Sequence, residues 1–223
     1  MSLKQKVKTF FNARIVKSTV MTGVSKGMKL NYDINNRFQH LLGFYEREIY
    51  KYLQKGFYKA ETLIDVGAND GYYVLAMLKT GKSVIACEPG NANEELIKNA
   101  ALNGFELNKQ YTLVKQLIGN GATEEWISIN KLLKDKDKPV FILVDIDGAE
   151  FDLLQSCGDD LDYKNIIWLF ETHSTDLEKQ CMNFLREKGY TITLIKNAWW
   201  RSVIKESRPL PHNRWFYAEY SNA

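Results

Sequence analysis

A glycine-containing turn and a later carboxylate are the residues of this sequence best suited to binding chemistry. The turn reads Gly67-x-Asn69-x-Gly71 and directly follows an apolar run that contains Asp65. Glycines let the backbone approach a ligand closely, and a helix that begins at Gly71 points its free N–H groups at that ligand. Glu88, 23 positions after Asp65, is placed to accept hydrogen bonds from ribose hydroxyls. The pattern predicts a site for an adenosine-containing cofactor.

The spacing of this turn discriminates between cofactors. A dinucleotide-binding turn has the pattern G-x-G-x-x-G, whose second glycine lets the backbone reach a pyrophosphate. Here Asn69 occupies that place. S-adenosylmethionine has no phosphate, and its methionine tail, with a carboxylate and an ammonium group, suits Asp65 and Asn69. We therefore expect S-adenosylmethionine. A nicotinamide or nucleotide cofactor and a turn without a ligand are the alternatives, and the coupled Glu88-Pro89 argues against the last.

Two acidic patches further along the chain could act on a substrate. One contains Asp145 and Asp147, and the other contains Glu171 and His173. In an extended strand, residues two positions apart share a face, so the members of each pair are expected to project together. The first patch spans residues 145–150 and ends at Glu150, for which the alternative is an acid that stabilises the start of the following helix.

Methyl transfer to an alcohol requires removal of the hydroxyl proton as the oxygen attacks. A histidine with a pKa near neutrality can accept that proton, and a nearby carboxylate can orient it. We predict that His173, oriented by Glu171, is the base, with Asp145 and Asp147 beside it. A divalent metal ion bound by the acidic residues is the alternative, and we assign no metal ligand.

The order of apolar and amphipathic segments predicts an alternation of strands and helices. Strands are expected at residues 27–32, 62–66, 83–87, 111–117, 140–145, 166–170, 191–196 and 215–220. Helices are expected at residues 45–55, 71–79, 91–102, 129–134, 149–157 and 177–188. Alternation implies a parallel sheet with helices on both faces, and the last two strands lack a helix between them. We predict an α/β, Rossmann-like class I methyltransferase fold, with a mostly parallel seven-stranded sheet and a C-terminal antiparallel hairpin.

Four of the candidate acids fall at the ends of predicted strands. They are Asp65, Glu88, Asp145 and Glu171. Ligands of open α/β sheets bind at the carboxyl ends of the strands. The acids are therefore expected to meet at one edge of the sheet.

Composition limits the class of protein. The chain has 223 residues, of which 45% are hydrophobic, enough for one domain with a full core. Its three cysteines are scattered, which favours a reducing compartment over a disulfide framework or a zinc site. There is no apolar run of the roughly 20 residues that a membrane span needs, and the N-terminus has no apolar signal-peptide core. We expect a cytoplasmic protein.

The start of the chain is strongly basic. Residues 1–32 contain seven lysines and arginines and no acid, with Leu3, Val7, Phe10 and Phe11 on one helical face. We predict a basic arm or cap over residues 1–40 and a methyltransferase domain over residues 41–223. The arm is interpreted as a helix that docks on the domain or on a partner subunit. The alternative is attraction to an anionic acceptor or peripheral contact with a membrane.

Several of these motifs, in this order, resemble the FkbM family of S-adenosylmethionine-dependent methyltransferases. The segments are residues 43–46 (GFYE), 65–73 (DVGANDGYY), 88–89 (EP), 145–150 (DIDGAE) and 171–173 (ETH). The chain departs from the usual pattern of the family at Leu143 and Asp147, where lysine and glutamate are common. The resemblance implies O-methylation of a glycan, a glycolipid or a natural product.

The resemblance also implies roles for individual residues. The cofactor would be bound by Glu46, Asp65, Gly67, Asn69, Gly71, Tyr73, Glu88, Pro89, Gly119, Asn120 and Asp145. The acceptor pocket could be lined by Trp199, Trp200, Arg201, Arg208, His212 and Arg214. The alternative for the two tryptophans is packing under the hairpin, with solvated arginines.

A different acceptor class on the same fold is the main rival. An N-methyltransferase of RNA or protein would share the cofactor site. Adenine amino-methyltransferases usually carry an Asn/Asp-Pro-Pro-Tyr/Phe loop after the fourth strand, where this chain has residues 145–148 (DIDG). A nucleic acid partner is therefore not expected, although the basic arm keeps RNA open.

Overall fold

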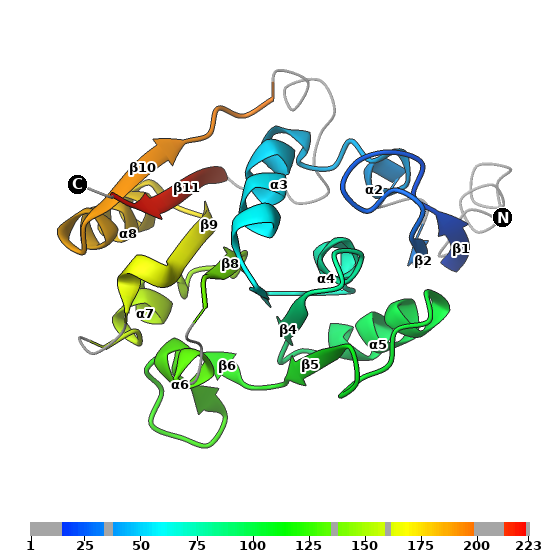
Figure 1. Ribbon diagram of the computed structural model, residues 1–223, viewed down its shortest axis with the longest axis horizontal. Coiled ribbons are helices and arrows are strands. Elements are labelled where there is room, and N and C mark those ends of the chain that lie inside the picture. Colours follow the sequence, from blue (N-terminus) through cyan, green and yellow to red (C-terminus); the bar gives the residue numbers. More distant parts are fainter. Residues whose placement is uncertain (1–14, 34–37, 135–137, 159–161, 199–211, 222–223) are drawn as a thin grey trace, which may run out of the picture.

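The computed structural model describes residues 15–33, 38–134, 138–158, 162–198 and 212–221. Its centre is a seven-stranded sheet with the order β10-β11-β9-β8-β3-β4-β5 (Figure 1). The strands are β3 (Thr62–Val66), β4 (Ser83–Cys87), β5 (Tyr111–Val114), β8 (Val140–Val144), β9 (Ile166–Thr172), β10 (Tyr190–Leu194) and β11 (Arg214–Tyr220). β3, β4, β5, β8 and β9 pair in parallel, whereas β11 runs antiparallel to both β9 and β10. This confirms the predicted fold class.

Helices cover both faces of this sheet (Figure 1). They are α3 (Tyr50–Lys59), α4 (Tyr72–Leu78), α5 (Ala92–Leu102), α6 (Ile129–Leu133), α7 (Glu150–Gln155) and α8 (Thr175–Glu187), with a short α2 (Phe38–Leu42) and 3₁₀ turns η1 (Arg47–Ile49) and η2 (Tyr163–Asn165). Successive strand residues enter opposite layers: Leu63 packs in the layer of α3, α4 and α5, and Ile64 in the layer of α6, α7 and α8.

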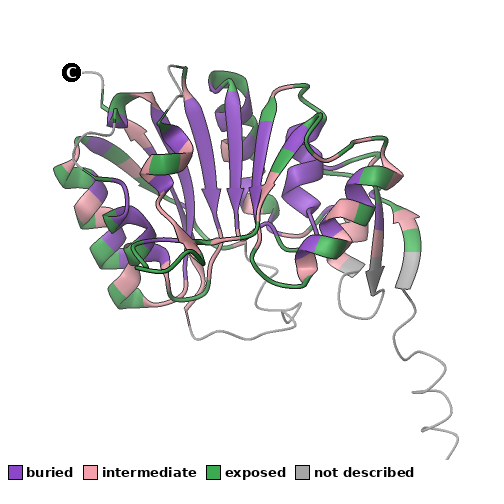
Figure 2. Cartoon of the chain, turned by 90° about the horizontal axis from the view of Figure 1, so that it is seen from below, coloured by how far each residue is buried: buried purple, intermediate pink, exposed green. Residues whose placement is uncertain are grey.

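The central strands are buried along their whole length. Every residue of β3, β8 and β9 is buried, and Figure 2 shows these strands between helices whose outer surfaces are exposed. Parallel strands covered on both faces have continuous apolar sequences, which is why they could be located from the sequence. Their carboxyl ends lie at one edge of the sheet (Figure 2), where Asp65, Asp145 and Glu171 are found.

Residues 15–33 contribute a small second sheet that packs on the domain. β1 (Ile15–Thr19) and β2 (Lys29–Asp33) are antiparallel; β2 was expected and β1 was not. The backbone N–H groups of Lys29 and Asn31 donate to Asn103 Oδ1 and Asn99 Oδ1, both at 2.8 Å. Leu30 is buried in the core, so this part of the basic segment is integrated into the domain.

The apolar face expected on the first residues of the arm lies outside the described residues. Its docking partner, and contact with a membrane, therefore stay predictions. None of the helices in the described part of the chain is both long and apolar enough to cross a membrane.

Several element boundaries differ from the sequence-based expectation, most clearly in two places. The strand expected at 111–117 stops at Val114, and a separate β6 (Leu117–Ile118) pairs with β7 (Trp126–Ile127). The helix expected at 45–55 begins at Tyr50, after η1, and continues to Lys59. Such boundaries depend on local tertiary packing more than on propensity.

Gly56 gives a test of the packing between α3 and the sheet. A Cβ at this position would lie 2.1 Å from Phe141 Cδ2, so the alanine would overpack the core. We expect Gly56→Ala to lower the free energy of unfolding by about 1–2 kcal/mol, because a clash of about 1–3 kcal/mol exceeds the gain in helix propensity of about 1 kcal/mol. Urea denaturation measures this change.

The double variant is the control. In a Phe141→Leu background the ring is gone, and Gly56→Ala should then be neutral or stabilising. If Gly56→Ala alone raised the free energy of unfolding of the otherwise wild-type protein, this result would contradict the packing argument.

Candidate active site

The turn after β3 fits closely between the ends of two neighbouring strands. Gly67 has φ of 90°, and a Cβ there would lie 1.9 Å from the carbonyl oxygen of Asp145. On the other side, the N–H groups of Gly67 and Ala68 both donate to Cys87 O at 3.0 Å. Because of the contact with Asp145, only glycine fits at position 67. Gly71, also with φ of 90°, begins α4.

Glu88 is fixed beside this turn by two backbone hydrogen bonds. Its Oε2 accepts from the N–H of Asn69 at 2.9 Å, and its Oε1 accepts from the N–H of Gly90 at 2.8 Å. Asn69 adopts a left-handed conformation with φ of 48°, which asparagine tolerates better than most residues. The structure thus brings together the glycine turn and Glu88, which the sequence analysis predicted to form one site.

Buried carboxylates lie at the ends of β3, β8 and β9. Burial, and then the charge of Asp145, raises the pKa of Asp65 well above its usual range. Burial also raises the pKa of Asp145 well above its usual range, followed by the charge of Glu171. Asp65 Oδ2 and Glu171 Oε1 are buried without a hydrogen-bond partner. Within the described part of the chain, the ion pairs of Asp145 and Glu171 are with His173.

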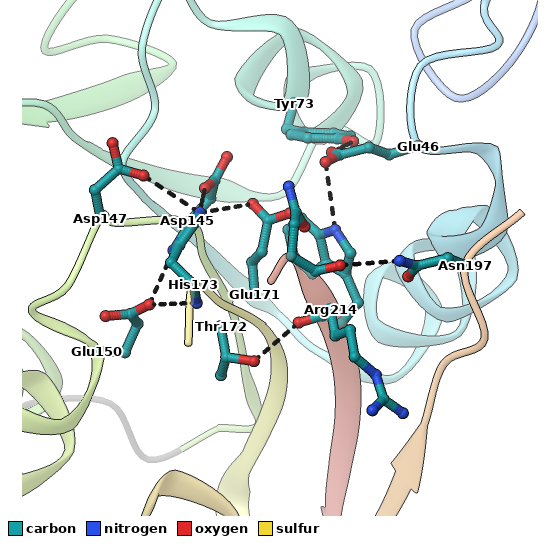
Figure 3. A network of polar contacts seen from close by, with 12 residues as sticks. Glu46, Tyr73, Asp145, Asp147, Glu150, Glu171, Thr172, His173, Asn197 and Arg214 are labelled. Atoms are coloured by element: carbon teal, nitrogen blue, oxygen red, sulfur yellow. Dashed lines mark hydrogen bonds and ion pairs between the residues drawn. The ribbon is translucent and has the colours of Figure 1, made fainter. Parts of the chain in front are cut away.

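His173 lies at the centre of these acids (Figure 3). Its Nε2 is 3.3 Å from Asp147 Oδ1, 3.5 Å from Glu171 Oε2 and 3.6 Å from Asp145 Oδ1. The four residues that the sequence predicted as catalytic are therefore neighbours. The strand register explains this, because Val144 of β8 pairs with Phe170 of β9 and the acids directly follow both.

Glu150 is a member of the cluster that the sequence analysis did not name as a site residue. It is fully buried, and its Oε1 accepts the backbone N–H of His173 at 2.9 Å and lies 2.8 Å from Nδ1 of the same ring. Glu150 therefore holds the ring at Nδ1, while Glu171 Oε2 lies 3.5 Å from Nε2; the expectation that Glu171 orients the ring stays a prediction. The acid-rich run at residues 145–150 indicated that Glu150 could belong to the cluster. The direction of its side chain toward His173, however, depends on how α7 packs.

The electrostatics of His173 bear on its predicted role as the base, which stays a prediction. Burial opposes the charged ring, but its hydrogen bonds with Glu150 and Glu171 outweigh burial and raise the pKa of His173 to about 10. At neutral pH the ring therefore carries a proton on each nitrogen and would have to lose one before it could accept another.

Glu46 connects the turn before α3 to the site from above (Figure 3). Its Oε2 accepts from the hydroxyl of Tyr73 at 2.6 Å, and its Oε1 accepts from Trp215 Nε1 at 3.3 Å. Glu46 is buried and has φ of 45°. The expected residues Glu46 and Tyr73 are thus in contact, and Trp215 is an addition that the sequence did not indicate.

The remaining candidates lie at the periphery or outside the described residues. Pro89 and Asn120 are exposed, and Gly119 packs against Trp126; their contact with the cofactor stays a prediction. His212 Nε2 and Arg214 Nε lie 3.3 and 3.4 Å from Glu178 Oε2. The other acceptor-pocket candidates, Trp199, Trp200, Arg201 and Arg208, lie outside the described residues.

Comparison with known proteins gives one family and several structures of the same fold. The methyltransferase FkbM domain matches residues 65–192, more than half of the chain. A search of curated proteins found no match. Among solved structures, the FkbM methyltransferase from Methylobacillus flagellatus KT is 19% identical, with a TM-score of 0.54 over 72% of this chain and 44% of that one.

Two other structures support the fold assignment. The ribosomal protein L11 methylase from Lactobacillus delbrueckii subsp. bulgaricus is 17% identical, with a TM-score of 0.53 over 79% of this chain and 78% of that one. The putative methyltransferase yhhF from Escherichia coli is 14% identical, with a TM-score of 0.53 over 93% and 100%. At such identities the likeness concerns the fold.

The raised pKa of His173 predicts a pH dependence of stability. The ring's pKa rises from an ordinary 6.5 to about 10 on folding, so its contribution is complete below pH 6.5 and is lost as the pH approaches 10. We expect the melting temperature of the wild-type protein to exceed that of His173→Gln most at pH 6 and least at pH 10. Calorimetric scans in buffers with a chelator measure this difference in melting temperature. A difference that is the same at every pH would contradict the conclusion that the folded protein holds His173 in its charged form.

Proposed function

The chain belongs to the FkbM methyltransferase family, and we propose that it uses S-adenosylmethionine to methylate a hydroxyl group of a glycan, a glycolipid or a natural product. One observation carries this proposal. The glycine turn and Glu88 lie directly beside a group of buried carboxylates, some without partners, at the carboxyl edge of the sheet. Cofactor and acceptor would meet there.

The charge of this edge favours S-adenosylmethionine over a dinucleotide. Its sulfonium and ammonium groups are cations. This edge provides the buried carboxylates of Asp65 and Glu171, which are costly without such a partner, and the partly exposed carboxylate of Asp145. The pyrophosphate of NAD would instead be repelled by the same groups. Glu88 is proposed to accept from the ribose, and Asp65 and the turn to hold the methionine tail.

The transfer itself needs one proton acceptor. When bound, S-adenosylmethionine would supply the methyl group on a positively charged sulfur, with S-adenosylhomocysteine as the leaving group, and the hydroxyl that takes the methyl group would have to lose its proton. The side chains of Asp145 and Asp147 are 28% and 52% exposed, whereas that of His173 is 8% exposed. We place the hydroxyl proton on Asp145, because it is both accessible and in contact with the cofactor turn through Gly67.

The same charges bear on the acceptor class. Carboxylates accept hydrogen bonds from hydroxyl groups, so an uncharged, hydroxyl-rich acceptor suits this edge. A nucleic acid backbone needs lysine and arginine contacts, and the described cluster is acidic. Methyl transfer from labelled S-adenosylmethionine to a panel of glycans, small alcohols, RNA and protein tests the proposal. If RNA or protein became labelled and the glycans and alcohols did not, this result would overturn the proposed hydroxyl acceptor.

Glu88 gives a test of the cofactor. Glu88→Gln turns one acceptor oxygen into an amide donor that faces the N–H groups of Asn69 or Gly90. We expect the affinity for S-adenosylhomocysteine to fall by about 1.5–3 kcal/mol, roughly 10- to 150-fold, in isothermal titration calorimetry. Glu94→Gln, an exposed acid of α5, is the matched control and should bind as the wild type does. Binding of NAD by the wild-type protein would contradict the assignment of S-adenosylmethionine as the cofactor.

Asp145 gives a test of the chemical step. Asp145→Asn removes the proposed proton acceptor with little change in volume, so kcat should fall by about 10²–10⁴. The affinity for S-adenosylhomocysteine should change far less. Asp176→Asn, an exposed acid of α8, loses the same charge and should keep its activity. An Asp145→Asn enzyme with wild-type kcat would remove Asp145 from the mechanism.

A further inference from the structure

We propose that Asp145, Glu171 and His173 form a binding site for a divalent cation at the carboxyl ends of β8 and β9. One ligand atom from each of these residues lies within 4.8 Å of the other two. The use of the ion, to polarise an acceptor hydroxyl, rests on the proposed function. The existence of the site does not.

The first argument is that too many acceptors converge on one donor. His173 Nε2 carries a single hydrogen at most, yet oxygens of three carboxylates lie 3.3–3.6 Å from it. These distances are long for hydrogen bonds to a charged donor, which are about 2.7–2.9 Å. For the two proposed carboxylate ligands, Glu171 at 3.5 Å and Asp145 at 3.6 Å, they lie close to the upper end of the separation of about 3.0–3.5 Å between ligands that share one ion at bond lengths of about 2.0–2.2 Å.

The second argument is a buried carboxylate without a partner. The side chain of Glu171 is 3% exposed, and its Oε2 faces His173 Nε2 (Figure 3). Its Oε1 makes no hydrogen bond. An unpaired buried carboxylate is costly. A cation that bound Glu171 would remove this cost.

The orientation of His173 is the one that a ligand histidine needs. Histidines that bind metals usually direct their other ring nitrogen to a carboxylate, which fixes the tautomer. Glu150 Oε1 occupies this place at 2.8 Å from Nδ1. When a cation displaces the proton of Nε2, the lone pair of that nitrogen faces Asp145 and Glu171.

The exposed side of the site leaves room for a substrate oxygen. Asp145 and the neighbouring Asp147 are open to solvent, so a cation held from below would keep coordination positions free. An ion in such a position lowers the pKa of an oxygen that it binds. The two carboxylate ligands suit Mn²⁺, which is also a spectroscopic probe.

Electron paramagnetic resonance with Mn²⁺ alone tests the site on the full, metal-free chain. We expect loss of the free Mn²⁺ signal at one ion per chain, and electron spin echo modulation from a bound ¹⁴N nucleus. His173→Gln should abolish the modulation, and Glu150→Gln should weaken Mn²⁺ binding about 10- to 100-fold. Asp176→Asn should bind as the wild type does.

Two results would overturn the cation site: absence of a one-to-one complex in the wild-type protein, or ¹⁴N modulation that persists in His173→Gln. Both can be scored without activity, and the first needs no variant. Calorimetry with S-adenosylhomocysteine on the same metal-free samples separates the two proposals. If the protein binds S-adenosylhomocysteine but not Mn²⁺, the cation site is wrong and the proposed function is unaffected. If it binds Mn²⁺ but not S-adenosylhomocysteine, the proposed function is wrong and the cation site is unaffected.

Discussion

The contact between Gly67 and the backbone of Asp145 is the constraint on which the site depends. A Cβ at position 67 would lie 1.9 Å from Asp145 O, while the N–H of Asp145 donates to Val66 O at 2.9 Å. The turn that faces the cofactor and the residue that begins the acidic cluster are therefore held together by backbone atoms. Their relative position does not depend on side-chain rotamers, which is what a transfer between two bound molecules requires.

A second consequence of this geometry is an excess of buried negative charge. The ends of β3, β8 and β9 place Asp65, Asp145 and Glu171 close together. Burial raises their pKa values, followed by the charge of a neighbouring acid, which is Asp145 for Asp65, Glu171 for Asp145 and Glu46 for Glu171. Such an arrangement costs stability. The continuous apolar strands beneath it, with a helical layer on each face, supply the burial that offsets the cost. Perturbed carboxylates in this position are typical of functional sites.

The features of the fold and the site that could be predicted from the sequence are those that depend on residues close together in the chain. β3, β8 and β9 were located because a strand buried on both faces needs an unbroken apolar run, and the acids at their ends had to share an edge. β1 was missed because its residues find their partner only in β2. The contact between Glu46 and Trp215 joins residues 169 positions apart, and no local pattern records it.

The strand register accounts for the composition of the acidic cluster. β8 and β9 pair as far as Val144 and Phe170, so Asp145 and Glu171 occupy the same level of the sheet. β9 then continues past the end of β8, and Thr172 pairs with Arg214 of β11, which brings His173 back over the edge toward α7. A slip of one residue between β8 and β9 would exchange the two faces of the strand, turning Glu171 away from Asp145. The pairing of β9 with β11, which extends the strand by two residues, is therefore what fixes His173 between Glu150 and the strand-end carboxylates.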